Sequence, residues 1–187
     1  KMKDARIALD AVLNADSANS APCGWLKRLS EAGLPPSKLA DEINHLYGAF
    51  NAIDYIVTAA LVELAHSREW TERLRCELTS VLGKERAPSR AELQKLPQTN
   101  AFMLEVLRRY PVSMGVVRRA GAHLHLEGEH IAAGSEVMIS LYALHHHPEF
   151  WGNDALEMKP ERWLSSPSPA LPYSYVPFLE GPRKCLG

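Results

Sequence analysis

The chain has 187 residues, of which 46% are hydrophobic and 23% charged, and its formal net charge is −1. This composition is ordinary for a globular domain and lacks the basic excess that nucleic-acid-binding proteins show, so we expect no nucleic-acid partner. The three cysteines, Cys23, Cys76 and Cys185, lie far apart and form no CxxC pair. So sparse a set argues against a disulfide framework or a zinc ribbon and favours an intracellular, reducing compartment.

The first part of the chain is predicted to be helical. Residues 4–14 have the pattern of the end of a helix, residues 16–23 that of a loop, and residues 24–31 that of a short helix. A long helix is predicted from Lys38 to about His66, with Ser37 as its N-cap. Its segment from Leu46 to Ala65 is apolar enough to raise the question of a membrane span. Three polar side chains interrupt that segment, however, and favour a buried core helix: Asn51, Asp54 and Glu63.

Further elements alternate helical and extended patterns. Helices are predicted over Glu69–Leu82, Ser89–Leu96 and Asn100–Arg109, the second with Ser89 and Glu92 in capping-box spacing. Strands are predicted over 123–127 and 136–140, and a short turn or helix over 145–149. The stretch 151–177 is predicted to hold little regular structure. The fold class is therefore mainly α with a small β component.

The last ten residues, Phe178-Leu-Glu-Gly-Pro-Arg-Lys-Cys-Leu-Gly187, carry the strongest functional signal. Cys185 lies between two glycines and directly follows two cations. Nearby positive charge and open backbone amides favour the thiolate, which is the form that binds metal. The alternative, a cysteine that acts as a small buried hydrophobe, fits this polar and glycine-rich setting poorly.

The spacing Phe-x-x-Gly-x-Arg-x-Cys-x-Gly resembles the cysteine loop of the cytochrome P450 family. The resemblance implies a haem b whose iron is bound by the Cys185 thiolate, with Gly181 and Phe178 in the same loop and Phe178 packed near the sulfur. It also implies that Arg118 and Arg183 contact the haem propionates. A core aromatic is an equal alternative for Phe178.

The implied reaction is the insertion of one oxygen atom from O₂ into an organic, apolar substrate. Its electrons would come from NAD(P)H through a ferredoxin or flavoprotein reductase. His145 falls in a segment that the family shares, Tyr-Ala-Leu-His, where it is not a metal ligand.

Glu105 and Arg108 lie three residues apart, on one face of a predicted helix. Apolar neighbours on both sides indicate that this pair is not on an open surface. Arg162 offers a second guanidinium, and buried charges require such partners. In the family, a Glu–Arg–Arg set of this kind supports haem binding structurally and takes no part in the chemistry.

The long helix departs from the family pattern. An acid and an alcohol normally supply protons there for splitting dioxygen, but Asn51 and Ala52 stand at the matching positions, with Asp54 three residues beyond Asn51. Three hypotheses follow. In the first, the chain belongs to an ordinary monooxygenase whose protons come from water, Asn51, substrate groups or Asp54. In the second, it belongs to an enzyme that uses peroxide or rearranges an oxygenated substrate. In the third, it is a non-catalytic haem binder or a degenerate fragment. The complete cysteine loop argues against degeneration.

The resemblance covers nearly all of residues 1–187 but only the C-terminal portion of the family's single domain. We therefore expect a fragment that lacks the N-terminal half and the helix after the cysteine, and that is inactive by itself. Candidate substrate contacts are Phe50, Ile53, Asp54 and Val112–Val116, each equally consistent with a core role. Whether the protein is cytoplasmic or membrane-associated is left open by the sequence.

Overall fold

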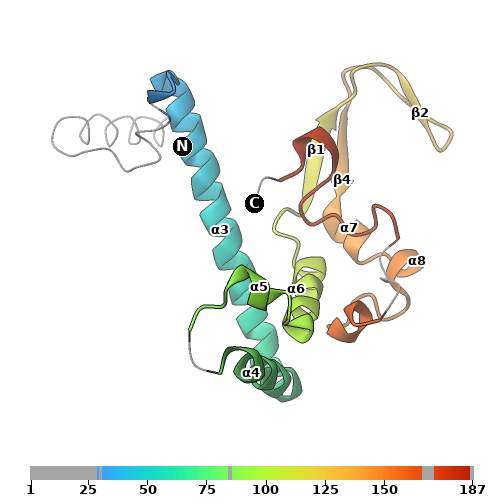
Figure 1. The fold of residues 1–187 in the computed structure, drawn as a ribbon. Helices are drawn as coiled ribbons and strands as arrows, with labels where there is room; N and C mark the ends of the chain where they lie inside the picture. Colours follow the sequence, from blue (N-terminus) through green and yellow to red (C-terminus); the bar gives the residue numbers. More distant parts are fainter. Residues whose placement is uncertain (1–28, 30, 84–85, 166–170, 186–187) are drawn as a thin grey trace. The chain divides into compact units, whose positions relative to one another are not determined.

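The computed structural model describes residues 29, 31–83, 86–165 and 171–185. The elements predicted over 4–14 and 16–23, and most of that over 24–31, lie outside these residues. The chain divides into two compact units, residues 1–53 and 54–187, and each is described by itself. The order of the elements along the chain can be followed by colour in Figure 1.

The long helix α3 spans Pro36–His66. The N–H groups of Lys38 and Leu39 donate to the carbonyl oxygen of Pro35 at 2.8 and 3.1 Å, so the first turn begins directly after Pro35. The prediction of Ser37 as N-cap is therefore wrong, because Ser37 lies inside the helix. The physical reason is Pro36, since proline is favoured at the first helical position, where its fixed φ suits the helix and its missing N–H costs nothing.

By length and composition alone, the segment Ser37–His66 could cross a membrane, and it is the one such helix among the described residues. Only 11% of its most apolar window is buried. The expectation of a buried core helix therefore fails for most of α3 within this chain. Large apolar side chains that are exposed in its two parts include Tyr47, Phe50 and Ile53 in the first unit, and Val57 and Leu61 in the second.

The C-terminal end of α3 packs into the core of the second unit. Ala59 and Ala60 are buried there against Trp70, Leu74, Phe102 and Val106. Glu63, one of the predicted interruptions, is paired with the end of a later helix: it accepts hydrogen bonds from Arg109, at 2.8 Å, and from the Tyr110 hydroxyl. A charge in an apolar helix is tolerated here because it has partners of its own.

Three helices follow α3 in the second unit. The first, α4 (Arg68–Leu82), is capped by the Ser67 hydroxyl and ends at Gly83 in the left-handed conformation. The predicted capping box is present at α5 (Arg90–Leu93). The third, α6 (Pro97–Arg109), begins three residues earlier than predicted. Its first turn is capped from outside, because the Glu77 carboxylate of α4 accepts the N–H groups of Gln98 and Thr99, both at 2.8 Å.

Two antiparallel pairs of strands make up the β component. Strand β1 (Gly115–Arg119) pairs with β4 (Glu136–Ser140), and β2 (Leu124–Leu126) pairs with β3 (Glu129–Ile131). The two predicted strands are present, whereas their partners β1 and β3 were not predicted. Gly115 allows a close approach, since a Cβ atom there would lie 2.8 Å from the backbone oxygen of Ile139.

Short helical turns follow β4. They are α7 (Leu141–His145), α8 (Pro148–Trp151) and the 3₁₀ turns η1 (Pro160–Trp163) and η2 (Gly181–Arg183). Helix α6 contacts both α7 and η1. The described part of 151–177 otherwise has little regular structure, as predicted. These irregular segments must be held by side chains, because they lack continuous backbone hydrogen bonding of their own.

Candidate functional site

A fully buried ion pair lies on α6. The side chains of Glu105 and Arg108 are both 0% exposed, three residues apart on the helix face that also buries Ala101 and Phe102. Arg108 binds the carboxylate with two parallel hydrogen bonds, from Nε at 2.9 Å and from an Nη at 2.8 Å. Such bidentate geometry is among the strongest that a guanidinium can form.

The Glu105 carboxylate also binds η1 and the residue before it. It accepts hydrogen bonds from Arg162 Nε at 3.0 Å, from the Trp163 indole N–H at 2.8 Å and from the backbone N–H of Lys159 at 3.0 Å. The structure thus brings together the three residues singled out in the sequence, Glu105, Arg108 and Arg162. The contributions of Lys159 and Trp163 were not predicted, because a backbone amide and an indole carry no charge pattern in the sequence.

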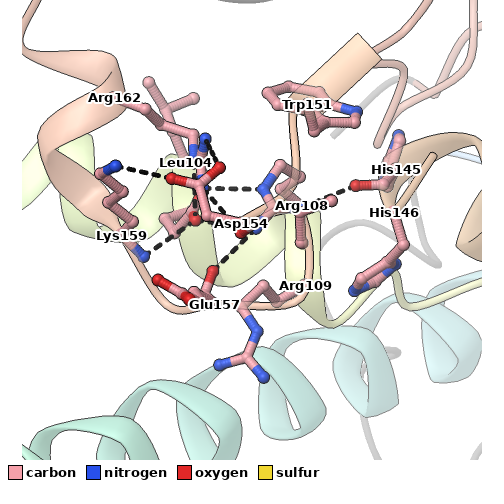
Figure 2. Close-up of polar contacts among 12 residues, drawn as sticks. Leu104, Arg108, Arg109, His145, His146, Trp151, Asp154, Glu157, Lys159 and Arg162 are labelled. Atoms are coloured by element: carbon pink, nitrogen blue, oxygen red, sulfur yellow. Dashed lines mark hydrogen bonds and ion pairs between the residues drawn. The ribbon is translucent and has the colours of Figure 1, made fainter. Parts of the chain in front are cut away.

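Arg108 uses its remaining donors on backbone carbonyls of the irregular segment. It donates to the carbonyl oxygens of His145, Ala155 and Glu157 at 2.7, 2.6 and 3.0 Å, and its guanidinium lies 5.1 Å from the centre of the Trp151 ring. The neighbourhood of Arg108 is drawn in Figure 2. One buried side chain therefore satisfies carbonyls that no secondary structure pairs.

Arg162 links the buried pair to the surface. It donates to a side-chain oxygen of Asp154 at 3.5 Å and to the backbone oxygen of Asp154 at 3.2 Å. Asp154 also binds the half-exposed ammonium group of Lys159 at 2.6 Å (Figure 2). The hydrogen bond from Lys159, together with the charge of Arg162, holds the pKa of Asp154 below its ordinary value.

Glu105 is ionised despite its burial. Desolvation by itself raises the pKa of this carboxyl, but the hydrogen bonds and charge of Arg108, with smaller contributions from Lys159 and Trp163, outweigh it and lower the pKa from its ordinary value. A buried charge is tolerable only with partners of this kind, and removing one partner of such a pair typically costs about 3–5 kcal/mol. The arrangement supplies position and rigidity, with no group free to act as an acid or base.

The segment leading to the cysteine is tied to the same region. The Tyr175 hydroxyl donates to the carbonyl oxygen of Leu104 on α6 at 3.1 Å, and the backbone N–H of Val176 donates to Nε2 of His145 at 3.0 Å. The Tyr175 ring also packs on Trp163, with centroids 4.6 Å apart. No role was predicted for Tyr175, and for His145 a role as metal ligand was the one excluded.

His145 is a fully buried neutral imidazole. Because Nε2 accepts a hydrogen bond, Nδ1 carries the proton, and this buried atom has no hydrogen-bond partner among the residues that the structure describes. Burial, reinforced by the charge of His146, lowers the pKa of His145 to about 4.

The cysteine loop is closed by its own backbone. The Cys185 N–H donates to the Phe178 carbonyl oxygen at 2.8 Å, and η2 lies between these two residues. Leu179 and Gly181 both have positive φ, 62° and 80°, so the chain reverses within a few residues. The ammonium group of Lys184 binds the Glu180 carboxylate at 2.9 Å, which offsets part of the positive charge expected beside the sulfur.

These residues fit a thiolate-bound haem. Cys185 is an exposed residue, and a cysteine thiolate suits iron. The Phe178 side chain is 42% exposed, so within this chain it is not buried in a core. Among the described residues, no set of three or more His, Cys, Asp or Glu side chains could hold a metal ion. A haem bound through one thiolate does not need such a set.

The other predicted site residues lie elsewhere on the chain. Arg118 is exposed on β1, with one hydrogen bond to the adjacent carbonyl of Val117 at 3.0 Å. The Arg183 side chain lies outside the described structure. Asn51 and Asp54 are both exposed on α3, in the first and the second unit respectively.

The candidate substrate contacts differ from one another in exposure. Phe50 and Ile53 on α3 are exposed, as are Val112 and Met114 after α6, whereas Val116 is half-buried at the start of β1. A core role is therefore wrong for the first four within this chain. Their exposure leaves them available to a ligand or to another part of a longer protein.

The buried imidazole predicts a pH dependence of stability. The folded-state pKa of His145, about 4, lies below the ordinary value of 6.5, so its contribution to stability is present above pH 6.5 and is lost as the pH falls toward 4. In the protein encoded by the complete reading frame that contains this chain, His145→Gln should flatten the fall in unfolding free energy over this range. Chemical denaturation at several pH values measures the slope.

His147→Gln serves as the control, because His147 is exposed on the same short stretch of chain. It should leave the slope unchanged. Equal slopes for the parent and for His145→Gln would contradict the assignment.

Comparisons with known proteins identify the family. A family model described as Cytochrome P450 matches residues 48–187. Cytochrome P450 734A5 from Oryza sativa subsp. japonica is 33% identical over 162 residues, which are 82% of this chain and 30% of that protein. Cytochrome P450 3A5 from Homo sapiens is 30% identical over 175 residues, which are 94% of this chain and 34% of that protein.

The fold agrees with that of a solved relative. A zebrafish cytochrome P450, solved in a structure with abiraterone, superposes with a TM-score of 0.80 at 24% sequence identity, over 98% of this chain and 46% of that one. The predicted mainly α fold with a small β component is confirmed. The chain spans about a third of the length of the two curated relatives. On the family model and these relatives together, the chain belongs to the cytochrome P450 family.

Proposed function

We propose that this chain is the C-terminal part of the single domain of a longer haem-thiolate monooxygenase, which inserts one oxygen atom from O₂ into an organic, apolar substrate. The observation that carries the proposal is Cys185, exposed in a loop that its own N–H closes onto Phe178. Membership of the cytochrome P450 family supports it. When bound, the haem supplies the redox and oxygen chemistry, and the protein supplies the ligand, the pocket and the proton route.

In this proposal the haem is held by the predicted residues. The Cys185 thiolate binds the iron, while Arg118 and Arg183 bind the propionates, since a guanidinium suits a carboxylate. Phe178 lies beside the sulfur and Gly181 shapes the loop. The left-handed backbone at Gly181 supports this role, because glycine adopts a φ of +80° freely whereas any residue with a side chain would be strained there.

Glu105, Arg108 and Arg162 act as positioning residues. They hold η1 and the segment around Ala155 against α6. Tyr175, which precedes the cysteine loop, is attached to the same helix by its hydrogen bond to Leu104. Their proposed contribution is to keep the loop in the conformation that receives the haem. None of them reacts.

The electrons are proposed to come from NAD(P)H through a ferredoxin or flavoprotein reductase. The sparse cysteines support a reducing, intracellular compartment. A small organic substrate and O₂ complete the set of proposed partners.

A second candidate function rests on α3. Asn51 and Ala52 can supply no proton as a general acid, and Asp54 is the nearest carboxyl along the chain. A haem-thiolate enzyme that uses peroxide, or that rearranges an oxygenated substrate, needs no protonation of dioxygen. It is therefore the alternative to the monooxygenase.

The ligand assignment is tested by Cys185→Ser in the complete protein. We expect this variant to lose the absorption of the reduced carbon monoxide complex at the wavelength from which the family takes its name, because an alcohol does not replace a thiolate on the iron. Cys76→Ser is the matched control, since Cys76 is an exposed cysteine on α4. A Cys185→Ser protein that keeps the band would refute the assignment.

The positioning role predicts a different effect for Glu105→Ala. Its removal leaves the buried Arg108 charge without its carboxylate, so we expect haem incorporation to be abolished, with little holoprotein recovered. Haem content per polypeptide, measured after purification, checks this. Glu157→Ala is the control, because Glu157 accepts the Arg108 hydrogen bond through its backbone oxygen, which the substitution keeps. A fully loaded and stable Glu105→Ala holoprotein would contradict the role.

The two candidate functions are distinguished by the oxidant that supports turnover, either O₂ with electrons from NAD(P)H or hydrogen peroxide. The monooxygenase predicts substrate turnover with NAD(P)H, O₂ and a redox partner, with product formed in proportion to the NAD(P)H consumed. Asp54→Asn should then reduce that coupling if Asp54 supplies protons. Turnover with hydrogen peroxide alone, and none with NAD(P)H, would instead establish the alternative.

A further inference from the structure

Three imidazoles lie together on the β2–β3 hairpin. The His125 and His130 rings have centroids 5.1 Å apart, and the His123 and His130 rings have centroids 5.3 Å apart. All three side chains are exposed. Neither the positioning network nor the cysteine loop uses them.

The hairpin explains why the three rings meet. Its two-residue turn, Glu127-Gly128, has positive φ at both positions, 49° and 86°, as a type I′ turn requires. The register places His125 directly opposite His130. Because pair types alternate from the turn outward, this pair is of the non-hydrogen-bonded type, in which facing side chains approach most closely.

His123 is the residue before β2, and the contact of its ring with that of His130 places it on the same face as His125. Leu124 and Leu126 are on the opposite face and are also exposed. The hairpin therefore has one face of imidazoles and one face of leucines. The histidines do not belong to the apolar side of the hairpin.

The separation of the rings suits a shared metal ion. Imidazole is the commonest metal ligand in proteins and binds zinc, copper and nickel well. Two imidazoles that bind one zinc ion tetrahedrally, each with its nitrogen about 2.0–2.1 Å from the metal, bring their ring centres to roughly 5 Å. The interplanar angle of 55° between His125 and His130 also lets both nitrogens turn toward one point, whereas the His123 ring lies nearly parallel to that of His130, at 17°.

We propose that the β2–β3 hairpin binds a divalent transition-metal ion, of the class Zn²⁺, Ni²⁺ or Cu²⁺, through His125 and His130. His123 supplies a third ligand after rotation of its exposed ring, and water fills the remaining positions. No preformed set of three ligands exists in the described residues, so this is a two-imidazole site that the ion completes. The proposal does not rest on the function proposed above.

The test is the binding of Zn²⁺ to the complete protein, purified without a polyhistidine tag and followed by titration calorimetry. Removing a residue that only hydrogen-bonds to a metal ligand typically lowers metal affinity about 10–100-fold. Removing a ligand itself should cost at least as much, so we expect His125→Gln and His130→Gln each to weaken Zn²⁺ binding by at least about tenfold. The double variant should bind more weakly than either single variant, because His123 is then the one imidazole of the three that remains and a single imidazole cannot chelate. His123→Gln should have the smallest effect of the three.

His66→Gln is the matched control, since His66 is an exposed histidine on α3 whose ring contacts the Val62 carbonyl oxygen within its own helix. It should leave the affinity unchanged, and circular dichroism should show that all variants are folded. With Cu²⁺ as the probe, electron paramagnetic resonance should show coupling to imidazole nitrogens, with one coupled imidazole fewer in His125→Gln than in the parent protein. Unchanged Zn²⁺ affinity in His125→Gln and His130→Gln, or equal weakening in His66→Gln, would overturn the proposal.

Discussion

The arrangement of the second unit depends on keeping one carboxylate ionised where water cannot reach it. Glu105 is fully buried, and its charge is tolerated only because α6 and η1 both supply donors to it. The same hydrogen bonds fix these donors in place. The carboxylate therefore needs α6 and η1, and α6 and η1 are in turn held together by the carboxylate. Desolvation of a carboxylate is costly enough that any conformation lacking one of these segments is strongly disfavoured.

Arg108 extends this constraint to a segment without regular structure. A lysine could neutralise Glu105, but it could not bind the carboxylate at two points and three backbone carbonyls as well, because it lacks the planar fork of donors. Tyr175 and Val176 then attach the chain before the cysteine loop to α6 and His145. A short series of contacts therefore joins the buried ion pair to the part of the chain that approaches Cys185.

Helical periodicity was enough to predict α4, α5 and the existence of α6, and the spacing of Glu105 and Arg108 indicated that they share a face. The sequence could not show which carbonyls Arg108 binds, because those of His145, Ala155 and Glu157 are ordinary backbone atoms far along the chain. The early start of α6 was missed for a similar reason, since its cap is a carboxylate on another helix. Strands β1 and β3 escaped prediction because partners in a sheet are chosen by pairing as well as by their own pattern.

The side chains of the network become more exposed from Glu105 outward, and this explains why the loss of one member costs more stability than the loss of another. Glu105 and Arg108 are both 0% exposed, the Arg162 side chain is 8% exposed, and those of Asp154 and Lys159 are 27% and 50% exposed. Arg162 is the second arginine beside one buried carboxylate, so it leaves an excess of positive charge inside. Asp154 balances that charge, and because Asp154 is partly exposed, water solvates part of its carboxylate. Loss of Asp154 would leave Arg162 still bound to Glu105 and Lys159 in contact with water, so the cost should be near that of a surface ion pair, about 1 kcal/mol or less. Loss of Glu105 would leave a cation that water cannot reach, so the position of the cysteine segment depends on the buried end of the network.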